Sequence, residues 1–224
     1  CSGSAGISIT VFPAASVSII PSQSSVCLGG SVSLNASGAT LYSWSTGNTG
    51  SALTVSPTQT TTYSVTGTDV NNCVATATAT VTVNPLPNVQ ASSGQPEICI
   101  NSPVQISASG ASSYVWSNGN VTNSFTDSPS QTTTYSVTGT DANGCTGTSS
   151  VTVQVVPELS VSIFANSNEI CEGGSITLQG QGALNYSWST GVQSPSITVS
   201  PTQTTFYTVT GTDNLGCSGS AGIS

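Results

Sequence analysis

The side chains best placed to do chemistry in this chain are seven cysteines, which could form disulfides or bind a metal. Six of them follow a 72-residue period, two to each repeat: Cys27, Cys73, Cys99, Cys145, Cys171 and Cys217. Cys1 is the periodic equivalent of Cys217, so we expect its partner outside the chain. There is no CxxC pair and no histidine, which disfavours a metal cluster. Regularly spaced thiols in a Ser/Thr-rich acidic chain predict disulfides and an oxidising, extracellular setting.

Two pairing schemes follow from this spacing. Cysteines can pair within a repeat, as Cys27–Cys73, or between repeats, as Cys27–Cys145 and Cys99–Cys217, with Cys171 then bonded to a later repeat. In an Ig-like sandwich the first cysteine is expected in the A–B loop and the second in the F–G turn, at opposite poles. A strand of about eight residues separates the poles by roughly 26 Å. Because a disulfide needs Cα atoms within about 7 Å, this geometry favours the between-repeat scheme. The within-repeat scheme and free thiols stay open.

Carboxylates recur beside the cysteines. Asp213 precedes Cys217, and Glu97 precedes Cys99 by two residues. If consecutive repeats stack pole to pole, Glu97 and Asp213 come together and are candidate ligands for Ca²⁺, which takes carboxylate and carbonyl oxygens. The alternative is that the aspartate opens an Asx-type turn, as in DANG at 141–144. No other cofactor is predicted.

Composition excludes several classes of function. The chain has no Lys, Arg or His, and eight carboxylates give a net charge of −8. Nucleic acids and anionic membranes attract proteins through Lys and Arg, so neither is an expected partner. Without His or Lys no ordinary nucleophile–base pair can form, so we predict no enzyme activity and no catalytic residues. No apolar run approaches the roughly 18 residues that a membrane span requires, so no membrane insertion is expected.

A repeat organises the whole chain. CSGSAGIS occupies residues 1–8 and again residues 217–224, an offset of three 72-residue steps. We therefore expect the chain to be a piece of a longer periodic polymer, in which each repeat is one folding unit. The predicted divisions are the last strand of a preceding repeat at 1–13, complete repeats at 14–85 and 86–157, and a third repeat at 158–224 whose last strand is incomplete.

The strand pattern predicts an all-β fold. Apolar residues alternate in short runs separated by Gly, Pro, Asn and Asp, which indicates a tandem array of Ig-like β-sandwich domains. In the first repeat we expect strands A near 15–20, B at 31–37, C at 41–45, E at 52–56, F at 61–68 and G at 74–83. The predicted core of this repeat consists of Leu34, Tyr42, Trp44, Leu53, Val55, Tyr63, Val65 and Val81, with equivalents 72 and 144 residues on.

Two aromatic positions recur with the repeat. Trp44, Trp116 and Trp188 lie in a YxWSxG-type pattern on strand C. A core position is the favoured interpretation for them, and a sugar-binding platform is the alternative. Tyr63, Tyr135 and Tyr207 follow SPTQTT-type turns, where a sandwich places a structural corner tyrosine.

These motifs in combination resemble a known family. CxGGSVxL, YxWSxG and PTQTTTYxVTGTDxxGC, followed by a TVTV strand, are similar to the Ig-like or PKD-like repeats of Bacteroidota surface proteins. The resemblance covers all three repeats, although the second has CINS at 99–102 in place of CLGG. It implies export by the type IX secretion system, as for the giant repeat adhesins of the gliding-motility type. It carries over no catalytic residues.

The sequence thus predicts a structural module of an extracellular or cell-surface filament or stalk. Its partners would be further copies of the same repeat, end to end, and its length and stiffness would come from disulfide-bonded sandwiches. The alternative is an adhesin that binds glycans or other cell-surface ligands along the array.

Overall fold

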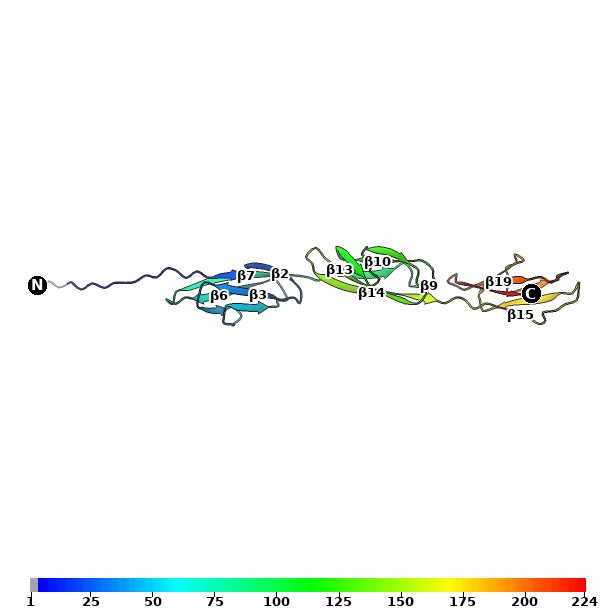
Figure 1. Ribbon diagram of the computed structural model, residues 1–224, viewed down its shortest axis with the longest axis horizontal. Helices are drawn as coiled ribbons and strands as arrows, with labels where there is room; N and C mark the ends of the chain where they lie inside the picture. The colour runs from blue at the N-terminus through cyan, green and yellow to red at the C-terminus, as the bar shows by residue number, and fades with distance from the viewer. Residues whose placement is uncertain (1–3) are drawn as a thin grey trace. The chain divides into compact units, whose positions relative to one another are not determined.

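The computed structural model of the chain describes residues 4–224. All of the regular secondary structure in that range is β-strand (Figure 1). The strands form six sheets, which face one another in pairs across three separate cores. The predicted all-β, Ig-like β-sandwich class is confirmed, whereas the division into four predicted segments stays a prediction. Cys1 lies outside the described residues.

The first sandwich has a three-stranded and a four-stranded sheet. The three-stranded sheet has the order β1 (Ser18–Ile20), β3 (Val32–Ser37), β5 (Ala52–Val55). The four-stranded sheet has the order β2 (Gln23–Cys27), β7 (Val74–Asn84), β6 (Thr61–Thr68), β4 (Leu41–Trp44). Alternate residues point inward, and the buried ones include Leu34, Trp44, Leu53, Val55, Tyr63, Val65 and Val81, while Tyr42 is half-buried. Period-two burial is what a sandwich with solvated outer faces produces.

Strand β2 corrects the expected strand order. Residues 23–27 were expected to belong to an A–B loop, but they pair in parallel with β7, with Ser24 opposite Val81 and Cys27 opposite Asn84. The segment QSSVC has little apolar alternation, so its strand conformation comes from pairing with the edge of β7 rather than from local pattern. No strand forms between β4 and β5, where only an isolated bridge joins Ser43 to Thr49.

The second sandwich repeats this arrangement. One sheet has the order β12 (Ser124–Asp127), β10 (Val104–Ser109), β8 (Gln90–Ser93). The other has the order β11 (Ser113–Trp116), β13 (Thr133–Thr140), β14 (Thr146–Val156), β9 (Glu97–Cys99). Strand β9 pairs in parallel with β14 as β2 does with β7. An edge-to-face chain of rings, Trp116–Phe125–Tyr135, crosses the core with centroid separations of 5.3 and 5.8 Å.

The third sandwich has six strands. Its sheets are β15 (Ser162–Ala165), β16 (Ile176–Gln181), β18 (Ser196–Val199), and β17 (Asn185–Trp188), β19 (Tyr207–Thr212), β20 (Ser218–Ile223). Fewer core side chains are buried here, namely Leu178, Tyr186, Trp188, Ile197 and Val209. Residues 167–171, which correspond to β2 and β9, form no strand.

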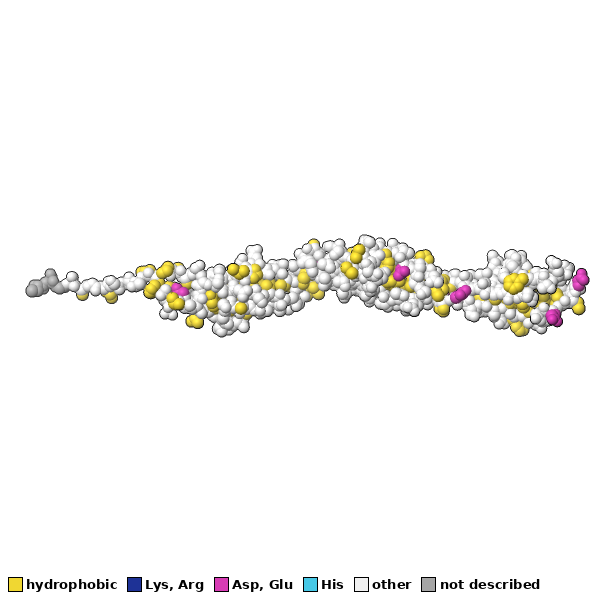
Figure 2. Space-filling model, in the orientation of Figure 1, with side chains coloured by type: hydrophobic (Ala, Val, Ile, Leu, Met, Phe, Trp, Pro, Cys, Tyr) yellow, Lys and Arg dark blue, Asp and Glu magenta, His cyan; other side chains and the backbone are white. Residues whose placement is uncertain are grey.

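The chain divides into two compact units. The first extends to Asn88 and includes Thr140–Gly147, the turn between β13 and β14, and the second comprises Val89–Gly139 and Thr148–Ser224. Residues 4–17, predicted in part as the last strand of a preceding repeat, contain no strand in this structure. No helix among residues 4–224 is long and apolar enough to cross a membrane. On the face drawn in Figure 2 the carboxylates are few and scattered among uncharged side chains.

Candidate functional site: the disulfide turns

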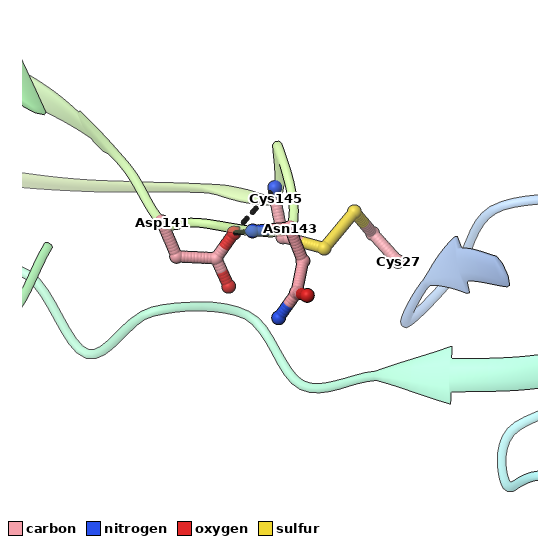
Figure 3. The surroundings of a disulfide bond; sticks show 4 residues. All are labelled: Cys27, Asp141, Asn143 and Cys145. Atoms are coloured by element: carbon pink, nitrogen blue, oxygen red, sulfur yellow. Dashed lines mark hydrogen bonds between the residues drawn. A yellow bond between two sulfur atoms is a disulfide. The ribbon is translucent and has the colours of Figure 1, made fainter. Parts of the chain in front are cut away.

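Two disulfides link cysteines of different repeats. Cys27 at the end of β2 bonds Cys145 in the turn between β13 and β14, with Cα atoms 5.5 Å apart (Figure 3). Cys99 at the end of β9 bonds Cys217 in the turn between β19 and β20, with Cα atoms 5.3 Å apart. Both bonds span 118 residues, and each lies inside one compact unit. They are the pairs predicted by the between-repeat scheme. In this scheme the first cysteine of a repeat bonds the F–G turn of the next repeat and not that of its own.

The turn that presents Cys145 is organised by one carboxylate. Oδ1 of Asp141 accepts hydrogen bonds from the backbone N–H groups of Asn143 and Cys145, both at 2.8 Å (Figure 3). Asp141 N–H in turn donates to the Cys145 carbonyl at 2.9 Å, and Gly144 takes φ +80°. A left-handed residue closes such a turn with least strain when it is glycine. The result is a hydrogen-bonded loop that holds the buried Cys145 at its end.

The same aspartate turn occurs in the other two repeats. Oδ1 of Asp69 accepts from Cys73 N–H at 2.8 Å, and Oδ1 of Asp213 accepts from Cys217 N–H at 2.9 Å. The Asx-turn interpretation of these aspartates therefore describes the structure. Sequence reasoning favoured this turn and kept a calcium site as the other possibility.

Replacing Asp141 by Ala is expected to loosen this turn. Two backbone donors, one exposed and one part-buried, lose a charged acceptor, which costs about 1–3 kcal/mol of stability. Asp141→Asn is the matched control, because its amide oxygen can accept the same hydrogen bonds. Thermal unfolding of the oxidised variants measures the difference, and equal melting temperatures for the Ala and Asn variants would contradict this role.

Each disulfide joins two turns, and we call the pair of turns a junction. The second turn of each junction is the tight turn that follows the first cysteine. Gly30 N–H donates to the Cys27 carbonyl at 2.7 Å, with Gly29 at φ +87°. The second repeat has Asn101 at φ +59° in place of the first glycine. Asn tolerates the left-handed region better than most side chains, so CINS supports the same turn as CLGG.

Two cysteines predicted in disulfides are free thiols in this structure, the half-buried Cys73 and the exposed Cys171. A 118-residue step backward from Cys73 or forward from Cys171 falls outside residues 4–224. Their disulfides therefore stay predictions.

The candidate calcium ligands lie beside the second junction. Glu97 lines a pocket with Cys99 and Leu215, and Oδ1 of Asp213 is engaged by backbone N–H groups of its turn. Among residues 4–224 no three His, Cys, Asp or Glu side chains lie together as a metal-binding group. Calcium binding at Glu97 and Asp213 stays a hypothesis.

The recurring aromatic residues pack inside the sandwiches. Trp44, Trp116 and Trp188 are all buried, and each indole N–H donates to a backbone carbonyl six residues on, at 2.9–3.0 Å. A second recurring tyrosine forms hydrogen bonds that the sequence analysis did not predict. The Tyr42 hydroxyl donates to the Ala39 carbonyl at 2.8 Å and accepts from Ala39 N–H at 2.9 Å. Tyr114 and Tyr186 hold the same B–C turn in their repeats.

A carboxylate sets the second repeat apart. Tyr135 is buried, and its hydroxyl donates to Oδ2 of Asp127 at 2.8 Å. The first and third repeats have Val55 and Val199 where the second has Asp127. Burial, the hydrogen bond to Asp127 and the charge of Asp127 together raise the pKa of Tyr135 from 10.0 to about 12.

This shift predicts an alkaline loss of stability. Since the folded pKa lies above the unfolded one, the unfolded chain loses its Tyr135 proton first as the pH rises. The contribution is complete below pH 10 and is lost between pH 10 and about 12. Tyr135→Phe removes it, so the difference in melting temperature between wild type and variant should shrink across that window. A difference independent of pH would contradict the prediction.

Comparison with known proteins gives architectural likeness at low identity. No family model matches the chain, and no curated protein matches it. Among solved structures, a 1.5-MDa bacterial ice-binding adhesin is 15% identical, with 94% of this chain and 96% of that chain covered and a TM-score of 0.35. A Ca²⁺-stabilised adhesin of an Antarctic bacterium is 12% identical, with 94% and 72% covered and a TM-score of 0.41. The eight N-terminal Ig domains of Down Syndrome Cell Adhesion Molecule are 9% identical, with 95% and 41% covered and a TM-score of 0.29.

Proposed function

We propose that this chain is a structural repeat module of an extracellular or cell-surface filament or stalk, without catalytic activity. The observation that carries the proposal is the disulfide pattern, in which the end of β2 or β9 bonds the F–G turn of the next repeat. We call these two strands the A′ strands, because each lies between strands A and B of its repeat. Successive sandwiches are thereby joined twice, once by the polypeptide linker and once by a disulfide. The resemblance to Bacteroidota surface repeats supports the same assignment, with export by the type IX secretion system and further copies of the repeat as partners.

The mechanism we propose is mechanical. A force applied to the two ends of the chain can pass from Cys27 directly to Cys145, or from Cys99 directly to Cys217. The shortest covalent path uses both bonds and runs through residues 1–27, 99–145 and 217–224, which are 82 of the 224 residues. The oxidised chain should therefore reach only a little over one third of the extended length of the reduced chain, at roughly 3.3–3.6 Å per residue. Force spectroscopy with and without a reductant measures this limit.

Burial of the aromatic residues favours a stalk over an adhesin that binds along its length. Stacking on a sugar needs an exposed ring, and the three tryptophans are buried. The exposed aromatic side chains within residues 4–224 are Phe12, Phe164 and Phe206, which are not equivalent positions of the repeat. A glycan array probed with the oxidised chain tests the adhesin alternative, which saturable binding to one glycan class would support.

Immunogold electron microscopy of intact cells that produce the protein tests the main proposal. The expected result is label along extracellular fibres at regular intervals. Thin sections of the same cells with label confined to the cell interior, and no label on intact cells, would contradict it.

A further inference from the structure

Three Asn-x-Ser/Thr triplets occur in the chain, and the structure gives them different surroundings. They begin at Asn35, Asn120 and Asn185. In an exported protein this triplet is the acceptor for N-linked oligosaccharide, and it is used where it lies in a surface loop. Asn35 lies inside β3 and is paired with both neighbouring strands, and Asn185 is the first residue of β17, opposite Thr212. Of the three, Asn120 alone lies outside a strand, in the loop that joins β11 to β12.

The triplet at Asn120 is folded into an Asx turn. Oδ1 of Asn120 accepts a hydrogen bond from the backbone N–H of Thr122 at 2.9 Å, and the Thr122 hydroxyl donates to the same oxygen at 2.6 Å. The hydroxyl hydrogen is shared with the Ser124 carbonyl, which is also 2.6 Å away. Among residues 4–224 no group is hydrogen-bonded to Nδ2 of Asn120, so the amide nitrogen is left to react while its oxygen is held by two donors.

The buried tryptophan of the repeat holds this loop in place from the inside. Trp116 N–H donates to the Asn120 carbonyl at 2.8 Å, and the Trp116 indole N–H donates to the Thr122 carbonyl at 3.0 Å. Between these two anchored residues Val121 is 68% exposed, Thr122 is exposed and Asn120 is half-buried. The triplet is therefore a formed turn on the surface and not part of a ladder of strand hydrogen bonds.

The other two repeats form the same loop without the triplet. In both of them the indole N–H again donates to the carbonyl six residues on, at 2.9 Å. The position of Asn120 is taken by Asn48 in the first repeat and by Val192 in the third, and Gly50 stands where the first repeat would need Ser or Thr. Because the loop forms without the triplet, its fold does not explain the hydroxyl of Thr122.

We propose that Asn120 is an attachment site for an N-linked oligosaccharide, which an oligosaccharyltransferase transfers from a polyprenyl diphosphate donor. Nδ2 of Asn120 forms a bond to C1 of the first sugar and loses one proton to a base of the transferase. The bond from C1 to the diphosphate oxygen breaks, and the polyprenyl diphosphate leaves with the electron pair. The two donors on Oδ1 stabilise the negative charge that develops on this oxygen as the nitrogen loses its proton.

An oligosaccharide on Asn120 lies beside two free strand edges. Strands β11 and β12 are each the outermost strand of a sheet of the second sandwich, and the loop of Asn120 joins them. Free edges invite pairing with another chain, and natural proteins commonly block them with lysine. The chain has no lysine. A bulky, hydrated sugar at this loop blocks the two edges by volume instead of by charge.

In vitro transfer to the folded, oxidised chain tests the site. The chain is incubated with a purified single-subunit oligosaccharyltransferase that accepts Asn-x-Ser/Thr and with its lipid-linked donor, and enzymatic deglycosylation in ¹⁸O-water then marks each modified asparagine for mass spectrometry. Occupancy of Asn120 should exceed that of Asn35 and Asn185 by about tenfold or more, because strand residues reach an enzyme only when their ladder hydrogen bonds break. An unmodified Asn120, or equal occupancy at all three sites, would overturn the inference.

Short synthetic peptides that contain one triplet each are the control for intrinsic reactivity. The three peptides should be modified at similar rates, because none of them is held in a fold. If the peptides showed the same preference for the Asn120 triplet as the folded chain, the fold would not be the cause of the preference, and the role given to the loop would be wrong.

Thr122→Val and Thr122→Ser form a matched pair of variants. Valine keeps the shape of the side chain but removes the hydroxyl donor, so modification of Asn120 should be lost. Serine keeps the hydroxyl and should retain modification. Equal melting temperatures of the two unmodified variants would show that the loop is intact in both. Modification of the valine variant at the rate of the wild type would contradict the role of the hydroxyl.

The protein isolated from the cells that produce it shows whether the site is used. We expect glycopeptides that contain Asn120, and an unmodified Asn120 there would overturn the inference. The inference needs export of the chain but not the stalk proposal. An unmodified Asn120 on labelled extracellular fibres would remove this inference alone, whereas a modified Asn120 on a protein that forms no fibres would remove the stalk proposal alone.

Discussion

Trp116→Ala is expected to destabilise the second sandwich by about 3–5 kcal/mol, the usual cost of truncating a large buried aromatic side chain. Trp116 is buried, its indole N–H donates to the Thr122 carbonyl at 3.0 Å, and its ring packs edge-to-face on Phe125 at 5.3 Å. Its removal leaves a cavity and an unpaired carbonyl, and it breaks the ring chain that reaches Tyr135. A domain of this size has a small free energy of unfolding, so a loss of this magnitude is a large fraction of it.

Hydrogen–deuterium exchange resolves this effect repeat by repeat. Amides of β11, β13 and β14 should exchange faster in the variant, while β3 and β6 of the first sandwich keep their protection. Val115→Ala is the control, since Val115 is on the same strand but 58% exposed, and it should change stability by less than about 0.5 kcal/mol. Equal protection in both variants would show that Trp116 is not a core residue.

Removing the first disulfide with Cys27→Ser/Cys145→Ser has the second large expected effect. The bond closes a loop across 118 residues, for which chain entropy alone gives about 4–5 kcal/mol of stabilisation. Both cysteines are replaced so that neither is left to form a wrong bond. Guanidinium unfolding of the oxidised proteins measures the change.

Cys171→Ser is the matched control for the disulfide, because Cys171 is exposed and free in this structure. We expect its unfolding curve to overlay that of the wild type. Dithiothreitol should destabilise the wild type more than the double variant, which retains only Cys99–Cys217. Equal sensitivity of both proteins to the reductant would mean that Cys27–Cys145 does not stabilise the fold.

The strands with strong local signals could be predicted from the sequence. Alternation of apolar residues placed β3, β4, β5, β6 and β7 within a few residues of their observed bounds, because each buries one face against the core. Seven of the eight predicted core positions of the first repeat are buried, and the eighth, Tyr42, is half-buried because its hydroxyl serves the Ala39 turn.

The A′ strands could not be predicted in the same way. QSSVC and EIC are short and lie in parallel register against a strand more than 50 residues away, so tertiary contact decides their conformation. Their position also decides where Cys27 and Cys99 lie, since each cysteine is the last residue of its A′ strand. The pole-to-pole argument therefore favoured the observed pairs without identifying the element that carries them.

The Tyr135–Asp127 contact could have been predicted from the sequence but was not. Aligning the three repeats shows a carboxylate at 127 where the others have valine. An inward-facing acid on strand E requires a hydrogen-bond donor, and the hydroxyl of the neighbouring tyrosine is the one that the structure supplies.

Peptide mapping under non-reducing conditions tests the central claim most directly. Free thiols are first alkylated, and the chain is then digested with pepsin at low pH, where thiol–disulfide exchange is suppressed and no Lys or Arg is needed for cleavage. The account predicts linked peptides that contain Cys27 with Cys145 and Cys99 with Cys217. Linked peptides that contain Cys27 with Cys73 and Cys99 with Cys145 would contradict it.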